Sequence, residues 1–143
     1  MIPDHVELQL DIRTLPGWET RDVTRMLEDA LGDLYDEVEI EFICEDLSTT
    51  SPADTPLWSA LERASAEAYP GSRLVPFLTV GATDARIFRR LGTVAYGFGL
   101  FSERLTFEDY AVMFHGVDER VDVDSLRLSA ELWNRLTRDT IAI

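Results

Sequence analysis

Apolar and polar residues alternate along two segments near the start of the chain. In residues 6–15 valine, leucine and isoleucine fill every second position as far as Ile12, with charged or amide side chains between them. In residues 38–46 apolar residues again fill every second position from Val38 to Cys44, with glutamates between most of them. A period of two places the apolar side chains on one face of a β-strand. We therefore predict two strands, each with one wet face.

Between these strands the spacing of apolar residues changes to that of a helix. The residues that follow this spacing are Val23, Met26, Leu27, Ala30 and Leu31. A stripe at intervals of three and four predicts a helix over residues 20–31. Proline and glycine at 16–17 end the first strand, and Gly32 ends the helix because glycine accommodates the turn after a last helical residue.

After a polar stretch at residues 48–54 the pattern alternates between helices and short apolar runs. Thr55-Pro56 is typical of a helix start, and periodicity predicts helices over 56–69, 84–91 and 123–138. Nearly continuous apolar runs at 74–79 and 93–98 predict strands buried on both faces. Residues 99–119 are predicted to form a loop. In the last helix the residues expected to face inward are Leu126, Ala130, Trp133 and Leu136.

We predict an α/β architecture for the chain, divided into two unlike parts, an open α+β part followed by an α/β part. Residues 1–47 form an open strand–helix–strand unit, residues 48–54 a linker, and residues 55–143 alternating helices and strands. Two amphipathic strands and one helix bury too little apolar surface alone, so we expect further strands from elsewhere. The strand edges of both parts favour association with another chain.

The charge of the chain narrows the possible partners. Acidic residues number 27 and basic residues 13, all of them arginine, for a formal net charge of −14. A surface this acidic repels nucleic acid and anionic lipid, so neither is an expected partner. No apolar stretch approaches the ~20 residues of a membrane-spanning helix. The single cysteine, Cys44, fits a reducing compartment, and we expect a cytoplasmic protein.

The turn after the predicted strand 74–79 is the first candidate binding segment. In α/β sheets ligands bind at the carboxyl ends of strands, where Gly81 lets a ligand approach the backbone. Thr83 can donate a hydrogen bond from its hydroxyl, and Arg86 can bind a carboxylate with two hydrogen bonds. The alternative is an ordinary helix N-cap formed by Thr83 or Asp84.

His115 is the second candidate. It follows the apolar run 110–114 and precedes a glycine, so its imidazole is expected to emerge from the core into a cleft. Neutral imidazole is a common zinc ligand. The alternative is a hydrogen-bonded, half-buried histidine, with the acidic residues of 118–124 stabilising the start of the last helix.

Three stretches of the chain contain distinctive motifs. The first is Ile-Pro-Asp at 2–4 with Leu-Asp-Ile-Arg-Thr-Leu-Pro-Gly at 10–17. The second is Gly-Ala-Thr-Asp-Ala-Arg at 81–86, with glycine at 92 and Tyr-Gly-Phe at 96–98. The third is His-Gly-Val-Asp-Glu-Arg-Val at 115–121. Together these stretches resemble the metallopeptidase family of aminoacylase, glutamate carboxypeptidase, acetylornithine deacetylase and succinyl-diaminopimelate desuccinylase. They lie in the family's order and cover nearly the whole chain.

The resemblance implies a fold and a set of roles. Residues 1–47 would be part of a ferredoxin-like lid or dimerisation domain, and residues 55–143 the edge of the mixed α/β sheet of a zinc-hydrolase catalytic domain. His115 matches a metal ligand, and Thr83 and Arg86 match groups that contact the substrate. A complete site of the family holds two zinc ions bridged by an aspartate and a water, with a glutamate as general base.

The same resemblance places the other ligands and the general base before the lid domain. We therefore expect a part of a zinc-dependent hydrolase for small N-acyl amino acids or peptides that binds zinc weakly and is inactive alone. Its expected partner is a second copy of itself or the N-terminal part of the enzyme. The alternative is a non-catalytic association module whose lid strands pair with another chain.

Overall fold

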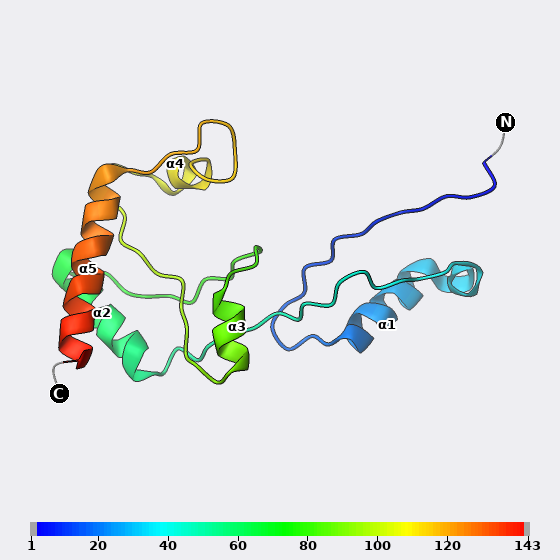
Figure 1. Cartoon of the computed structure of the whole chain (residues 1–143), viewed down its shortest axis with the longest axis horizontal. Helices are drawn as coiled ribbons and strands as arrows, with labels where there is room; N and C mark the ends of the chain where they lie inside the picture. The colour runs from blue at the N-terminus through cyan, green and yellow to red at the C-terminus, as the bar shows by residue number, and fades with distance from the viewer. Residues whose placement is uncertain (1–2, 142–143) are drawn as a thin grey trace. The chain divides into compact units, whose positions relative to one another are not determined.

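The computed structural model describes residues 3–141, and the regular elements in this range are helical. These elements are α1 (Thr20–Leu31), the 3-10 helix η1 (Gly32–Glu37), α2 (Pro56–Ala68), α3 (Ala85–Arg90), α4 (Phe107–Ala111) and α5 (Val123–Ile141) (Figure 1). The four predicted helices are confirmed, with ends shifted by at most a few residues. The helix α4 lies inside residues 99–119, which the sequence predicted to be a loop.

The predicted strands are not formed in the part of the chain that the structure describes. Residues 6–15, 38–46, 74–79 and 93–98 contain no strand, and the pairing expected between the first two segments is not seen. The apolar side chains of the first segment are exposed, with Leu8 at 82%. Phe77, predicted to be buried, is 77% exposed. A strand pattern creates a sheet only where partner strands supply hydrogen bonds, so the mixed α/β fold is not confirmed for residues 3–141.

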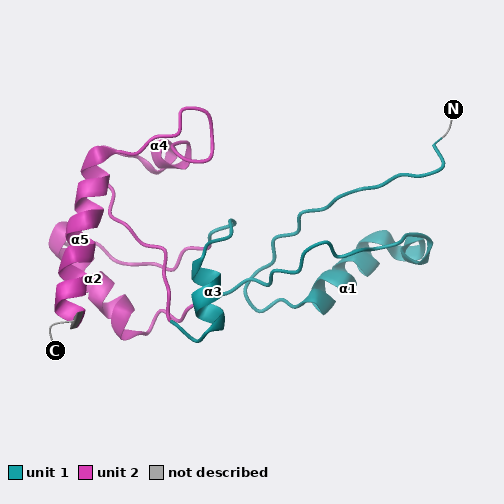
Figure 2. Cartoon of the chain, in the orientation of Figure 1, with its two compact units in different colours: residues 1–50, 79–93 teal, residues 51–78, 94–143 magenta. Residues whose placement is uncertain are grey.

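The chain forms two compact units, each made of two separate sequence segments. Unit 1 comprises residues 1–50 and 79–93, and unit 2 comprises residues 51–78 and 94–143 (Figure 2). Each unit is therefore built from segments that are far apart in sequence. The segment 79–93, which holds Thr83 and Arg86, belongs to the same unit as the N-terminal third of the chain.

Unit 2 contains the larger apolar core. Its centre is Leu61, which is 1% exposed, and it is formed mainly where α2 packs against α5. The other buried members are Ala64, Leu100, Leu132 and Leu136. The helix α2 begins as predicted, because the Thr55 hydroxyl accepts a hydrogen bond from the Trp58 amide at 3.1 Å and Pro56 is the first helical residue.

Residues 100 and 102 are held along α5 by serine side chains. The Ser129 hydroxyl accepts from the Leu100 amide and donates to the Leu100 carbonyl, each at 3.0 Å, and the Ser125 hydroxyl accepts from the Ser102 amide at 2.9 Å. These bonds follow directly after the predicted strand 93–98, which leads into the segment on the helix without forming a sheet. Gly99 permits the close approach, because a Cβ added there would lie 3.1 Å from the Ser129 oxygen.

The inward face of α5 differs from the predicted one. Leu136 is buried as expected, but Leu126 is 56% exposed and Trp133 is 39% exposed. The buried positions include Ser125 and Leu132 instead. The predicted and the observed sets of inward residues both follow the helical period. The observed face of α5 is the one that carries Ser125 and Ser129, whose hydroxyls bond the backbone of the neighbouring segment 94–102.

The described residues of unit 1 bury little apolar surface, and several hydrogen bonds and ion pairs connect its segments. Val23 of α1 is buried, whereas Met26, also predicted to face inward, is 37% exposed. The hydroxyl of Thr20 donates to the Glu45 carboxylate, and the hydroxyl of Ser48 donates to the Thr14 carbonyl at 3.0 Å. These bonds connect the end of each predicted strand segment to a residue just beyond the other segment. Within residues 3–141 no helix is long and apolar enough to cross a bilayer.

Candidate metal-binding and substrate-binding residues

His115 lies in a tight loop of unit 2 between α4 and α5. The loop is closed by a hydrogen bond from the Arg120 amide to the Met113 carbonyl at 2.9 Å. His115 has a left-handed backbone, with φ of 59°, and its amide donates to the Glu119 carboxylate at 3.2 Å. Its ring meets the edge of Phe114, with ring centroids 5.4 Å apart. The side chain is exposed, but the apolar run 110–114 before it is not the core segment that the sequence predicted, because only Met113 in it is buried.

The residues around His115 do not complete a metal site. Structural and catalytic zinc sites use three or four protein ligands in tetrahedral geometry. In the described part of the chain no group of three or more histidine, cysteine, aspartate or glutamate side chains could hold a metal ion. The acidic residue bonded to this loop, Glu119, accepts from the backbone of His115 itself. At this position the described residues therefore offer a single imidazole and do not fit a zinc ion by themselves.

Thr83 and Arg86 lie at the start of the short helix α3 in unit 1. The amides of Arg86 and Ile87 are bonded to the carbonyls of Thr83 and Asp84, at 3.1 and 3.0 Å. These two amides are consequently not available to a ligand. The alternative of a side-chain N-cap is not seen either, because no side chain makes a capping bond to α3. Of the groups predicted to hold an anion here, the guanidinium of Arg86 is the strongest candidate.

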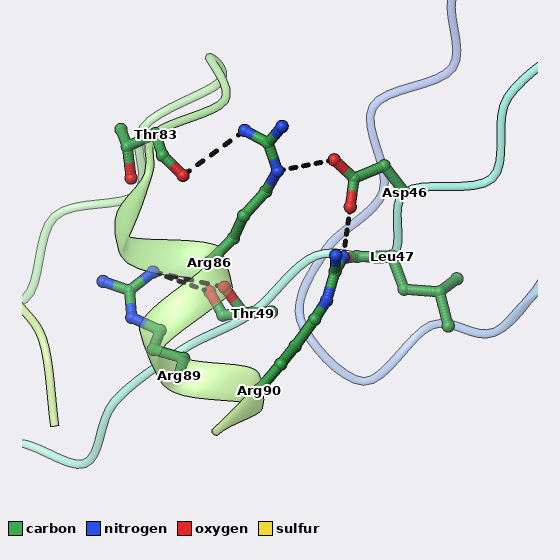
Figure 3. A network of polar contacts seen from close by, with 7 residues as sticks. All are labelled: Asp46, Leu47, Thr49, Thr83, Arg86, Arg89 and Arg90. Atoms are coloured by element: carbon green, nitrogen blue, oxygen red, sulfur yellow. Dashed lines mark hydrogen bonds and ion pairs between the residues drawn. The ribbon is translucent and has the colours of Figure 1, made fainter. Parts of the chain in front are cut away.

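The arginines of α3 are bonded to the segment 46–49 of the same unit (Figure 3). Arg86 and Arg90 both form ion pairs with Asp46, and the Arg86 Nε lies 2.7 Å from the carboxylate. Arg90 also donates to the Leu47 carbonyl at 3.1 Å, and Arg89 donates to the Thr49 carbonyl at 3.3 Å. The hydrogen bond from Arg90 and the charges of both partners hold the pKa of the Asp46 carboxyl below its ordinary value, although partial burial opposes this.

Sequence reasoning missed Asp46 because nothing in its local pattern marks it. It stands at the end of a predicted strand close to other acidic residues, and it is 40 positions before Arg86 and 44 before Arg90 in the sequence. The only indication in the sequence of a shared acidic partner is the spacing of the two arginines. Arg86 and Arg90 are one helical turn apart and so project from the same side of α3, where one carboxylate can meet both.

A comparison with protein families settles the relationship of the chain. The model of peptidase family M20/M25/M40 matches residues 3–139. The chain belongs to this family. The broader resemblance stated from the sequence is thus confirmed for the M20 peptidases, while no particular member is singled out. Neither a curated protein sequence nor a solved structure matches the chain significantly.

Membership in the M20 family indicates the general type of reaction to which this chain contributes. The family groups hydrolases and metallopeptidases that generally use zinc, so the match supports a zinc-dependent hydrolase. The match covers all three candidate residues, with Thr83 and Arg86 in unit 1 and His115 in unit 2. Their individual roles rest on the resemblance and remain predictions. The boundaries predicted for the lid, the linker and the catalytic part are likewise predictions.

Proposed function

We propose that this chain is a part of a zinc-dependent M20 hydrolase that cleaves amide bonds of small N-acyl amino acids or peptides. The observation that carries the proposal is the family match over residues 3–139. In this proposal His115 is a metal ligand, and Thr83 and Arg86 contact the substrate. The exposed imidazole of His115 and the partly exposed guanidinium of Arg86 support these roles, because both groups are open to a ligand.

The chain alone is proposed to bind zinc weakly and not to hydrolyse amides. Zinc affinity comes from several ligands held in fixed geometry, and a lone imidazole supplies only one of them. Zinc in the complete site would polarise the scissile carbonyl and activate a water. The described residues form no group of three ligands around His115, so no step of the reaction is assigned to them.

A second polypeptide segment is proposed to complete both the site and the sheets. The apolar faces of residues 6–15 and 38–46 are exposed, and edge strands with such faces pair readily with other strands. Another copy of the chain or an N-terminal part of the enzyme would turn these segments into the ferredoxin-like lid. The same partner would complete the mixed α/β sheet of residues 55–143.

The ligand role of His115 is tested with the two histidines of the chain. Zinc is titrated into the native chain and into His115→Ala and His5→Ala variants, with imidazole resonances followed by NMR and heat by calorimetry. We expect weak binding that shifts the His115 ring, is lost in His115→Ala and persists in His5→Ala. Equal zinc binding by His115→Ala and the native chain would contradict the assignment.

A non-catalytic association module is the second candidate function. The observation that favours it is the exposure of the alternating apolar residues in residues 6–15, with Val6 at 73% and Leu10 at 68%. A module of this kind would associate equally well with and without zinc, and His115→Ala would not change it. Amide hydrolysis by the assembled protein, lost in His115→Ala, would exclude this candidate.

A further inference from the structure

The carboxylate of Asp46 is shared between two guanidinium groups of α3. Its Oδ2 atom lies 2.7 Å from Nε of Arg86, and its Oδ1 atom accepts from Nη2 of Arg90 (Figure 3). The side chain of Asp46 is 32% exposed and that of Arg86 is 34% exposed, so the pair is partly shielded from water. One negative charge between two positive ones leaves the cluster with a net positive charge. The cluster therefore still attracts an anion.

The guanidinium of Arg86 is fixed at two of its three nitrogens. Nε is bonded to Asp46, and Nη1 lies 3.4 Å from the Thr83 carbonyl as a hydrogen-bond donor. The terminal edge formed by Nη1 and Nη2 points away from Asp46 (Figure 3). This edge is one of the two through which arginine binds a carboxylate with parallel hydrogen bonds. Asp46 thus engages the Nε side of the guanidinium, and Nη2 together with the second hydrogen of Nη1 is left to a ligand.

We propose that Asp46 is the positioning residue that orients Arg86 to receive the carboxylate of the substrate. The inference rests on the proposed function, in which Arg86 contacts the substrate. Arginine has many rotamers, and ordering a flexible side chain during association costs affinity. Asp46 orders Arg86 before the ligand arrives, and Arg90 holds Asp46 in place. A competing role, in which Asp46 blocks Arg86, predicts the opposite change in affinity.

The test measures how well the native chain and its variants bind a carboxylate. The probe is N-acetyl-L-alanine, with its amide as the uncharged counterpart, and the signal is the Nε–Hε resonance of Arg86, assigned by its loss in Arg86→Ala. We expect the carboxylate, and not the amide, to shift this resonance in the native chain. In Asp46→Ala the dissociation constant is expected to rise roughly fivefold, the size that ordering one flexible side chain accounts for.

Two further variants separate positioning from charge and from folding. Asp46→Asn keeps an oxygen that can accept from Arg86, so it should restore part of the affinity and the fold. Glu45→Gln makes the same change of net charge one residue away, and it should leave the preference for the carboxylate over the amide unchanged. A purely structural role of Asp46 would lower the melting temperature without changing that preference.

The outcomes distinguish this inference from the function on which it rests. No shift of the Arg86 resonance by the carboxylate in the native chain would remove Arg86 from the substrate site, and the role of Asp46 with it. Binding that is weakened by Arg86→Ala but unchanged or tightened by Asp46→Ala would retain the proposed substrate contact and overturn the positioning role alone.

Discussion

Single residues with unusual backbone or charge mark the two candidate segments. His115 adopts a positive φ, which is uncommon for a residue with a Cβ and recurs at functional sites. Asp118, in the same loop, has a φ of 63°. At the other segment, Asp46 gathers two arginines that are a helical turn apart. The positive φ of His115 and the ion pairs of Asp46 both depend on the surrounding chain, which must keep these residues in their present conformations.

The left-handed backbone at 115 predicts a stability difference between two substitutions. His115→Gly should be more stable than His115→Ala by about 1 kcal/mol, because a Cβ is unfavourable at positive φ. Urea unfolding measures the difference. Val112, with φ of −103°, is the control position, where the alanine variant should be the more stable one. Equal stability of the two variants at 115 would show that the loop relaxes to another conformation.

The ion pairs of Asp46 predict a loss of order at acidic pH. The pKa of Asp46 is lower in the folded chain than its ordinary value, mainly through the hydrogen bond from Arg90. Its contribution to stability is therefore present above the ordinary pKa of aspartate, about 4, and is lost as the pH falls through the lower folded pKa. The protection of the amides of residues 46–49 against exchange, measured relative to their intrinsic rates at each pH, should fall in this range. The Asp46→Asn variant should lack this pH-dependent step, and persistence of the step would assign it to another carboxyl.

At the scale of the elements, caps explain why helices begin where they do. Thr55 caps α2 and was recognised in the sequence. Thr106 caps α4, where its hydroxyl accepts from the Asp109 amide and its own amide donates to the Asp109 carboxylate. This Thr-x-x-Asp pattern is a helix-start signal that the prediction of a loop over 99–119 overlooked. Short helices are therefore readable from caps even where apolar periodicity is too brief to show.

The contact between residues 94–102 and α5 predicts a steric effect at Gly99. Gly99→Ala should destabilise unit 2 by about 1 kcal/mol or more, because the new Cβ would lie 3.1 Å from the Ser129 oxygen and strain both of its hydrogen bonds to Leu100. Gly97→Ala is the matched control, since nothing lies within 4 Å of a Cβ there. Thermal unfolding compares the two, and an equal loss in both variants would rule out the contact with Ser129 as the cause.

At the scale of the whole molecule, many large apolar side chains remain exposed to solvent in both units. The exposed apolar side chains include Val6, Leu8, Leu10, Val75, Phe77 and Leu78, all in segments predicted to be strands. Exposed apolar segments of this kind mark surfaces that contact another chain. The net charge of −14 opposes association through repulsion, which salt screens.

Association through residues 6–15 is therefore expected to be salt-dependent. Light scattering coupled to size exclusion should give a mass above that of one chain, increasing with salt concentration. Leu8→Glu, at a position 82% exposed, should weaken the association. Gln9→Glu adds the same charge at the next position, on the opposite face of the predicted strand, and should weaken it less. A stable monomer at high protein concentration in the presence of salt would contradict the prediction.

Local chemistry allowed the sequence alone to determine the helices and the family. Caps, glycine stops and helical periodicity act within a few residues, so α1, α2, α3 and α5 were predictable, and the motifs around Thr83, Arg86 and His115 indicated the M20 peptidases. Only the tertiary structure decided which stripe of α5 is buried, that residues 79–93 join the N-terminal unit, and that Asp46 meets Arg86. The alternating segments indicated strands, but a strand needs a partner distant in sequence, and periodicity cannot specify whether or where that partner is found.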